Sequence, residues 1–599
     1  MSVREPSLLG QRHAEAQALR GNKGQLAAYD SQGHCVVLAG PGSGKTKVLT
    51  LKMARMLAED VRPPRGVACI TYNNECAREL QRRLYQLGVR ESQRIFIGTV
   101  HSFCLQKVIL PYARLAGLRL SEPIRIASQK DQLDSLAAAL TACGVENSNP
   151  RDWETGIDLY RRNHPNRWDS SWSDEDSLPA CISKFYEDDL HSRGRVDFDD
   201  MAIWGLNLIE GYGWIRNLLK ARFPILVVDE YQDLGVLLHR IVLSLCFGAG
   251  VRLFAVGDPD QSIYSFTGAN PRLLHELSER PDVQTVRLQL NYRCGKNIIR
   301  ASQIVLAEER EYEAAQDTNQ GIVAEPYGCP GNIEEQARIV CSEIVPTALV
   351  RRPGRNLSDI AVLYQNKQAG DAIAAAADDH GLDIIRIDQN APYRKTPLTR
   401  WLEDCASWCS EGWRLGEPPF AELTRRGLSF DRQLYSERQF LHRKRQLVQF
   451  LWTHRAPNTR LHDWLMDFNE CYLEHVFDGQ LKLRNDHEDF MQLIASCTVS
   501  GRLSDFSVSR FGRQGGAPDH LNLITLHSAK GREFDVVIIP GLDSGKLPHY
   551  RATPTGQREA RRLFYVGLTR AKHEVHLLYS EATGPSRFLV ELWNGLQEA

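Results

Sequence analysis

The sequence predicts an α/β fold built on parallel sheets, and three observations lead to this prediction. Short runs of apolar, often β-branched residues recur along the chain, and each ends in a Gly-rich or acidic turn. A helical pattern follows each run, and this alternation is typical of parallel sheets covered on both faces. The 599 residues are enough for roughly three to five domains. The predicted strands are CVVLAG (35–40), VACIT (67–71), PILVVDE (224–230), RLFAVGD (252–258), DIAVLY (359–364) and DVVIIPG (535–541).

The predicted strands fall into two groups, residues 1–290 and 295–599, which indicates two α/β domains in series. Two stretches, 105–195 and 400–515, lack strand patterns and are expected to be helical insertions within these domains. The second insertion contains the basic run RQFLHRKRQ (438–446). A solvated helix face is the better interpretation of this run than a DNA contact.

Composition excludes some classes of protein and leaves others open. The 73 Lys and Arg nearly cancel the 74 Asp and Glu, which excludes a chain-wide basic field but not a local phosphate-binding groove. No segment has the ~20 apolar residues of a membrane span, and the charged start is unlike a signal peptide, so we expect a cytoplasmic protein without a membrane partner. The 14 cysteines are scattered. No cysteines have zinc-like spacing, which argues against a metal or thiol enzyme, and Cys35, Cys69 and Cys246 are expected to be buried, reduced thiols.

A Gly-rich segment between a predicted strand and a predicted helix has the pattern of a phosphate-binding loop. Its glycines allow successive backbone N–H groups to surround a phosphate, with the positive end of the helix beside it. Lys45 would reach the β- and γ-phosphates, and the Thr46 hydroxyl would ligate Mg²⁺. An ordinary Gly-rich turn would not be expected to match so long a pattern in this context. The loop residues are Ala39, Gly40, Pro41, Gly42, Ser43, Gly44, Lys45 and Thr46.

Two carboxylates follow the apolar strand ILVV. Asp229 would lie at the carboxyl edge of the sheet, beside the phosphate loop, and hold Mg²⁺ through water. Glu230 would orient or deprotonate the attacking water. Alone, such a pair would often cap a helix, but with the phosphate loop upstream it predicts a nucleotide triphosphatase.

The chain resembles the UvrD/Rep/PcrA-like superfamily 1 helicases from about Asn22 to Leu592. The family's motifs occur in the family's order, and this ordered set is far more specific than any single motif. They are NKGQ (22–25), AGPGSGKT (39–46), ITYNNECA (70–77), GTVHSF (98–103), VDFDDM (196–201), DEYQD (229–233), VGDPDQSIYSFTGA (256–269), LNYRC (290–294), TLHSAKGREFDVV (525–537), EARRLFYVGLTRAK (559–572) and PSRF (585–588).

The resemblance implies two tandem RecA-like domains, each interrupted by a mainly helical insertion. The first domain would comprise residues 1–104 and 196–294, with its insertion at 105–195. The second would comprise 295–399 and 516–599, with a reduced insertion at 400–515.

The resemblance also implies roles in binding and hydrolysing ATP with Mg²⁺. Rigid, always-charged guanidinium groups suit the charge that spreads over γ-phosphate oxygens, and supplying them across a domain gap would couple hydrolysis to closure. The implied roles are adenine recognition by Gln25, base stacking by Tyr292, a position beside the adenine for Lys47, γ-phosphate sensing by Gln261, arginine fingers at Arg293 and Arg570, and a ribose or metal-side contact by Glu533.

Single-stranded DNA would lie across the tops of both sheets. Base stacking on aromatic rings is worth ~1–3 kcal/mol per base and tolerates any sequence. Taken singly, each ring would more simply be packed in the fold, but its place within a motif favours stacking. The implied stacking residues are Tyr72, His101, Tyr264, Phe266 and His527, and the implied phosphate contacts are Thr71 and Asn74.

The chain departs from the family pattern at several positions. Glu75 stands where the family usually has Lys, Lys47 where many relatives have Arg, and Thr267 where Arg is normal. Only EATG separates the strand VHLLYS (575–580) from PSRF, where relatives have a longer β-hairpin. The 400–515 insertion is short, and APYRKTPLTRWLEDC lacks the usual entry signature. We therefore expect weak duplex unwinding by the isolated chain and intact translocation.

The resulting functional hypothesis is an ATP-driven translocase and helicase on single-stranded DNA and its junctions with duplex, moving 3′→5′ as the family does. The alternative is a DNA-stimulated ATPase that regulates or powers a partner, such as a nuclease or a repair or defence factor. No nuclease motif follows residue 572, so cutting would come from another chain. Nucleotide binding without hydrolysis is a poor third interpretation because both carboxylates and both fingers are present.

Overall fold

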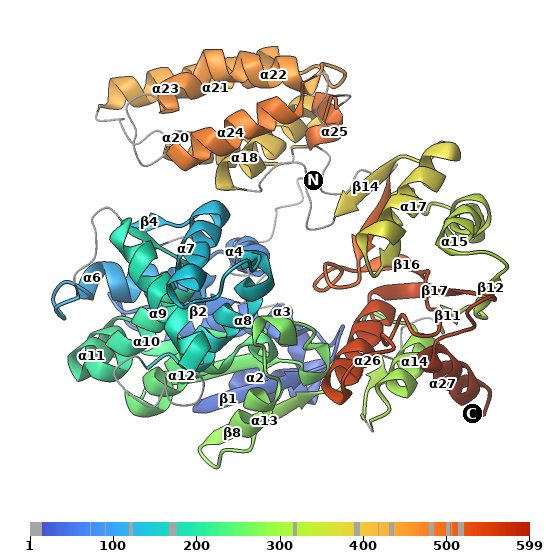
Figure 1. Ribbon diagram of the computed structural model, residues 1–599, viewed down its shortest axis with the longest axis horizontal. Helices are drawn as coiled ribbons and strands as arrows, with labels where there is room; N and C mark the ends of the chain where they lie inside the picture. Colours follow the sequence, from blue (N-terminus) through green and yellow to red (C-terminus); the bar gives the residue numbers. More distant parts are fainter. Residues whose placement is uncertain are drawn as a thin grey trace, which may run out of the picture.

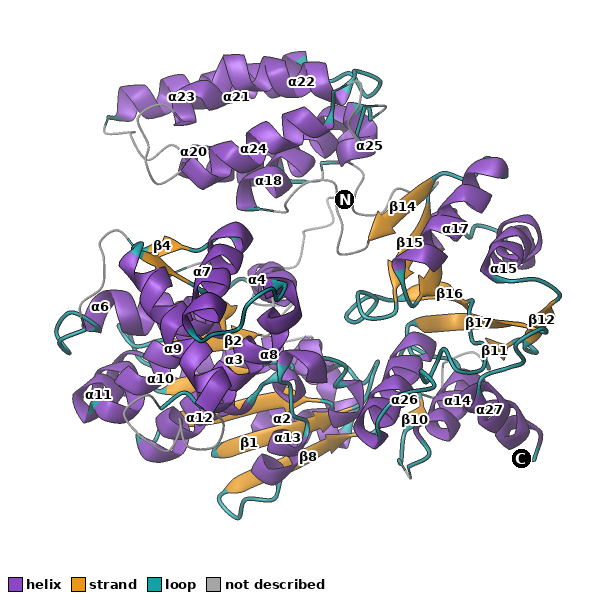
Figure 2. Ribbon diagram, viewed as in Figure 1, coloured by secondary structure: helices purple, strands orange, loops and turns teal. Residues whose placement is uncertain are grey.

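The structure is a computed structural model of the chain (Figure 1). It contains two parallel sheets covered by helices and two groups of helices outside the sheets (Figure 2). The described residues are 15–71, 74–89, 92–118, 124–166, 177–308, 310–315, 320–387, 396–416, 418–430, 436–477, 484–498, 503–504, 506–512 and 520–598.

The first sheet has six parallel strands in the order β3-β2-β6-β7-β1-β8. The strands are β1 (His34–Ala39), β2 (Val67–Thr71), β3 (Ile95–Thr99), β6 (Ile225–Val228), β7 (Arg252–Gly257) and β8 (Val283–Leu288). The helices around them are α2 (Lys23–Asp30), α3 (Lys45–Arg55), α4 (Asn74–Gln86), α5 (Val100–Phe103), α6 (Leu110–Tyr112), α10 (Phe198–Gly211), α11 (Gly213–Arg222), α12 (Val236–Leu243) and α13 (Arg272–Ser278).

Alternate residues of the central strands bury against opposite faces of this sheet. Cys35 and Val37 pack with α3 and α4 on one face, whereas Val36 packs with α10 and α12 on the other. Both faces are therefore apolar, which explains why these strands read as continuous apolar runs in the sequence.

The second sheet has seven parallel strands, in the order β11-β17-β16-β13-β15-β14, with β12 also paired to β17. They are β11 (Ile322–Val323), β12 (Tyr327–Cys329), β13 (Ile360–Tyr364), β14 (Ile384–Ile387), β15 (Leu521–Thr525), β16 (Phe534–Ile539) and β17 (Ala571–Ser580). One face packs with α14 (Lys296–Leu306), α26 (Pro554–Leu568) and α27 (Arg587–Gln597). The other packs with α15 (Ile333–Ile339), α16 (Val345–Arg351) and α17 (Lys367–Asp379). The predicted fold class is confirmed.

The first insertion consists mainly of three helices, α7 (Gln129–Ala142), α8 (Pro150–Asn163) and α9 (Ser177–Ser192), around a small apolar core. The prediction that this stretch lacks strands is wrong in one detail. β4 (Arg125–Ile126), before α7, pairs with β5 (Arg195–Val196), after α9. These strands have only two residues each, too few for a periodic sequence pattern.

Arg161 of α8 is fully buried and joins the insertion to the first residues of α10. Its guanidinium contacts Glu187 at 2.8 Å, Asp197 at 2.6 Å and Asp200 at 2.8 Å. Asp197 and Asp200 also form the capping box of α10, so the same carboxylates cap a helix and neutralise a buried cation.

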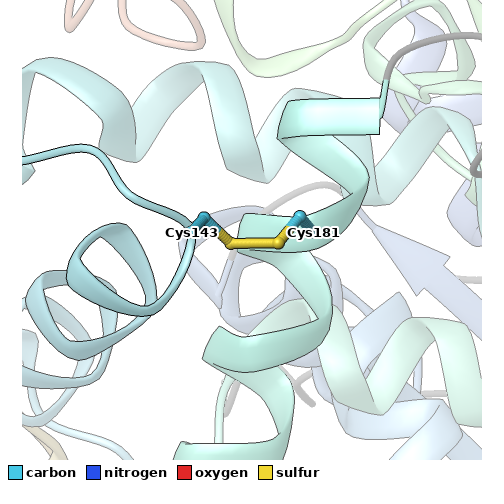
Figure 3. Close-up of a disulfide and its surroundings, with 2 residues drawn as sticks. All are labelled: Cys143 and Cys181. Atoms are coloured by element: carbon cyan, nitrogen blue, oxygen red, sulfur yellow. A yellow bond between two sulfur atoms is a disulfide. The ribbon is translucent and has the colours of Figure 1, made fainter.

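A disulfide joins Cys143, at the carboxyl end of α7, to Cys181 of α9 (Figure 3). Their Cα atoms are 6.3 Å apart, although 38 positions separate them in the sequence. Sequence spacing gave no indication of this pair, because the packing of α7 against α9 creates it. Cys35, Cys69 and Cys246 are buried and unpaired, as predicted.

The second insertion is mainly helical in its described part, with one isolated antiparallel bridge between Arg460 and Ser507, and gathers above the sheets in Figure 1. Its core surrounds the buried Trp401 and Trp464. Its α-helices are α18 (Pro397–Ser407), α19 (Trp413–Leu415), α20 (Phe420–Phe430), α21 (Glu437–Thr453), α22 (Leu461–Phe468), α23 (Glu474–Phe477), α24 (Arg484–Ser496) and α25 (Val508–Gly512).

The basic run 438–446 lies on α21, mostly on its exposed face. The exception is Arg443, which is buried over the Tyr472 ring and donates to the Tyr472 carbonyl oxygen. Among the described residues, no helix combines the length and apolarity needed to cross a membrane.

Replacing Arg161 with Leu should strongly destabilise the first insertion, because the buried Asp197 and Asp200 and the partly buried Glu187 would lose their cation. Breaking a buried ion pair in this way typically costs about 3–5 kcal/mol. We expect an earlier unfolding transition in urea, and Arg151→Leu, on the exposed first turn of α8, should leave it unchanged. Equal stability of the two variants would contradict the assigned role of Arg161.

Candidate functional site

The predicted phosphate loop connects the carboxyl end of β1 to the first turn of α3. Gly42 and Gly44 have φ angles of 68° and 85°, which only glycine adopts easily. The Ser43 hydroxyl donates to the Gly40 carbonyl oxygen at 2.7 Å, and Gln25 Nε2 donates to the Ser43 carbonyl oxygen at 2.8 Å. One hydrogen bond within the loop and one from α2 thus fix the loop conformation.

Lys45 is the feature of this loop that points to a ligand. Its ammonium Nζ is buried and has no hydrogen-bond partner within the described structure, and it lies 3.9 Å from Glu230 Oε1. A buried cation without hydrogen bonds is unfavourable. Phosphate oxygens would supply the acceptors that Nζ lacks, so the loop fits a nucleotide phosphate.

The two predicted carboxylates follow β6 at the same edge of the sheet. Burial, and then the neighbouring Glu230, raise the pKa of Asp229. Burial acts in the same direction on Glu230, but Lys45 and Lys530 outweigh it and lower the pKa of Glu230. Glu230 has a left-handed φ of 53° and accepts a hydrogen bond from Gln232 Nε2 at 2.5 Å.

These two carboxylates fit a magnesium site. A divalent cation beside Asp229 would relieve the burial of its charge next to Glu230. No group of three or more His, Cys, Asp or Glu side chains is placed to bind a metal within the described ranges. A Mg²⁺ ion at Asp229 would draw its other ligands from the predicted Thr46 hydroxyl, phosphate oxygens and water.

The loop after β7 lies between the phosphate loop and the carboxylates, because β7 separates β1 from β6 in the sheet. Asp258 organises it by accepting from the Asp260 backbone N–H at 3.0 Å and from Gln261 Nε2 at 2.7 Å. The Asp258 N–H donates to Gln232 Oε1 at 2.9 Å. Gln232 therefore bridges Glu230 to the loop that carries Gln261.

Side chains from the second half of the chain reach this site. Arg293 Nε contacts Glu533 at 2.6 Å, so the structure places Glu533 against a predicted arginine finger. Arg570 is buried and donates to the carbonyl oxygens of Val566 and Arg532. Burial, and then Arg293, lower the pKa of Arg570 to about 10, so it stays charged at neutral pH.

The predicted adenine-side residues lie next to the phosphate loop. Tyr292 is half exposed, accepts from Asn22 Nδ2 at 3.0 Å and donates its backbone N–H to the Gly42 carbonyl oxygen. Gln25 is buried beside Ser43, and Lys47 is partly buried in the first turn of α3.

The residues predicted to contact DNA are only partly brought together. The Tyr264 hydroxyl donates to the His527 carbonyl oxygen at 3.3 Å, which joins the two halves of the chain. His101 on α5 packs edge-on against Phe198, and Thr71 is buried at the end of β2. Asn74 begins α4, and Phe266 lies in the 3-10 turn Ser265–Thr267. Tyr72 and the side chains of Asn74 and Phe266 lie outside the described residues.

Several further contacts of this site were not predicted from the sequence. Lys530 Nζ contacts Asp233 at 2.6 Å and the Gln261 carbonyl oxygen at 2.6 Å, and Glu559 accepts from the backbone N–H and hydroxyl of Ser265. Lys530, Gln232 and Glu559 all lie within the quoted motifs, which was the available signal, but pairing them requires the fold.

Two family models match the chain. The UvrD/REP helicase N-terminal domain matches residues 21–282, and the UvrD-like helicase C-terminal domain matches residues 479–582. The chain is 28% identical to the ATP-dependent DNA helicase Rep of Escherichia coli K12, covering 96% of this chain and 94% of Rep. It is 26% identical to PcrA of Bacillus subtilis 168, over 96% and 86%. It is also 26% identical to UvrD1 of Mycobacterium tuberculosis H37Rv, over 90% and 80%.

Replacing Gly44 with Ala should disrupt nucleotide binding without unfolding the chain. The left-handed backbone costs a non-glycine residue roughly 1–2 kcal/mol, and the new Cβ would lie 2.7 Å from Gln25 Nε2. We expect affinity for a fluorescent ATP analogue to fall by on the order of tenfold. Gly33→Ala is the matched control, since its Cβ would meet no atom within 4 Å. Equal affinities would show that the loop conformation is not needed.

Proposed function

Because the chain belongs to the UvrD/Rep/PcrA-like family of ATP-dependent DNA helicases, we propose that it is a motor that moves 3′→5′ along single-stranded DNA and separates strands. One observation carries the proposal at the level of the site. The buried ammonium of Lys45 has an ion-pair contact with Glu230 but no hydrogen bond within the described structure, so it lacks the acceptors that phosphate oxygens would supply.

The proposed hydrolysis assigns a task to each part of the site. The loop N–H groups and Lys45 bind the phosphates, and Glu230 orients the attacking water and takes up its proton. Mg²⁺, when bound by Thr46 and Asp229, would neutralise phosphate charge. Arg293 and Arg570 stabilise the charge that develops on the transferred phosphoryl group, while Gln261 senses it.

The contacts between the two halves of the chain suggest how hydrolysis would drive movement. Lys530 bonds to the carbonyl oxygen of Gln261, the residue assigned to γ-phosphate sensing, and Tyr264 bonds to His527. A change in the phosphate site would alter both contacts. The predicted DNA-contacting regions around Tyr264 and His527 would then bind the strand tightly in alternation.

Two features support strong translocation with weak unaided unwinding. β17 ends at Ser580 and α27 begins at Arg587, and a tight turn in which Gly584 N–H donates to the Ser580 carbonyl oxygen fills the connection. No hairpin lies between them.

The second feature is the loss of two positive charges from the predicted strand groove, where Glu75 and Thr267 stand in place of the family's Lys and Arg. A protein partner, such as a nuclease or repair factor, would then complete the activity.

Replacing Lys45 with Ala should abolish ATP hydrolysis while single-stranded DNA binding survives, because Lys45 faces the phosphates and not the predicted strand groove. Steady-state ATPase rates and DNA binding by fluorescence anisotropy test this. Lys444→Ala, which removes an exposed lysine from α21, should retain both. Undiminished ATP turnover in the Lys45 variant would contradict the assigned function.

The short connection after β17 predicts a split between two DNA assays. The chain should displace streptavidin from the biotinylated end of a single strand, since this needs only translocation along that strand. It should unwind forked or blunt duplexes poorly when alone, because no hairpin abuts the junction. Robust unaided unwinding of long forks would show that the hairpin is unnecessary.

A further inference from the structure

A short segment after α14 crosses from the second half of the chain to the phosphate loop. Gln303 of α14 fixes this segment by donating through Nε2 to the carbonyl oxygens of Arg310 and Tyr312, at 2.8 and 3.0 Å. The next two residues form β10 (Glu313–Ala314), which pairs with β9 (Leu290–Asn291). Gln303 and the pairing with β9 therefore fix the backbone of the segment that carries the Arg310 and Tyr312 side chains.

Arg310 binds the loop that carries Gln261. Its guanidinium makes a two-pronged contact with Asp260, through Nε to Oδ2 at 2.7 Å and through Nη2 to Oδ1 at 2.9 Å. Asp260 is buried, and its backbone N–H donates to Asp258. A two-pronged contact fixes the orientation of Arg310 relative to Asp260 as well as their distance. Because Gln303 of α14 binds the Arg310 backbone, a movement of α14 would also move the loop that carries Asp260 and Gln261.

Tyr312 covers the beginning of the phosphate loop. A Cβ added to Gly40 would lie 2.6, 2.8 and 3.0 Å from Cε1, Cζ and Cδ1 of Tyr312, and these are its three nearest atoms. The ring also packs against the core beneath α14 and α26, and its hydroxyl lies 3.5 Å from Asp260 Oδ2. One side chain therefore contacts the second core, the phosphate loop and the Asp260 carboxylate.

We propose that Tyr312 is a positioning residue of the nucleotide site, acting with the Arg310–Asp260 pair. Through Tyr312, the position of the phosphate loop depends on the position of α14. The inference rests on the proposed ATPase function. Tyr312 acts through Gly40, where its ring occupies the space that a Cβ would need, and Arg310 acts through Asp260 on the neighbouring Gln261. Together they make the nucleotide site sensitive to movement of the second sheet and its helices.

The first test replaces Tyr312 with Ala. We expect the KM for ATP to rise by on the order of tenfold with a much smaller change in kcat, because a loosened loop binds ground state and transition state equally less well. Single-stranded DNA affinity without nucleotide should not change. Tyr312→Phe should behave like the wild type, since the ring is retained. Tyr327→Ala, on β12, is the matched control for loss of a tyrosine.

The second test is a suppressor experiment that a merely structural role of Tyr312 would not pass. Gly40→Ala should weaken ATP binding because its Cβ meets the Tyr312 ring and no closer atom. The double variant Gly40→Ala/Tyr312→Ala should bind ATP better than Gly40→Ala alone, since the obstructing ring is gone. Circular dichroism melting curves identify any variant that fails to fold, and Tyr312→Leu then replaces Tyr312→Ala.

The outcomes separate this inference from the function on which it rests. A wild-type chain without DNA-stimulated ATPase activity would overturn the proposed function itself. An active wild type whose Tyr312→Ala variant keeps its KM, or a double variant no better than Gly40→Ala, would overturn the role of Tyr312 alone. A raised KM with suppression in the double variant supports both.

Discussion

The buried ammonium of Lys45 is the constraint on which the arrangement of the site depends. A cation held away from water needs negative charge nearby, and here the sheet supplies it from Glu230 at the end of another strand. Glu230 is in turn held by Gln232, which also holds the loop of Asp258. Hydrogen bonds thus join the ends of β6 and β7 beside Lys45, and the Lys45 ammonium, which has no hydrogen bond within the described structure, stays available to phosphate oxygens.

Central strands could be predicted from the sequence, and edge strands could not. β1, β2, β6, β7, β13 and β16 are buried on both faces and read as continuous apolar runs. Among the strands that were missed, β3, β8, β11 and β14 lie at the edges of the two sheets. β8, for example, has exposed positions between its buried ones, so Gln284 and Arg287 interrupt its apolar pattern.

The candidate site shows the same division. Asp229 directly follows β6 and Lys45 follows the glycine loop after β1. Parallel topology carries both to one edge of the sheet, so their positions in the sequence suffice to predict a shared site. Arg310 and Cys143 gave no such signal, because their partners are set by packing between segments far apart in the chain. Both contacts depend on distances across the fold, which spacing along the sequence does not encode.

The strand order of the first sheet also has a consequence for synthesis of the chain. β1, which positions the phosphate loop, is flanked by β7 and β8, and it pairs with them through residues 252–288. The insertion and most of the domain lie between them in sequence. A growing polypeptide therefore carries β1 without its two pairing partners through more than two hundred residues of translation, and the first sheet is complete only after β8 leaves the ribosome.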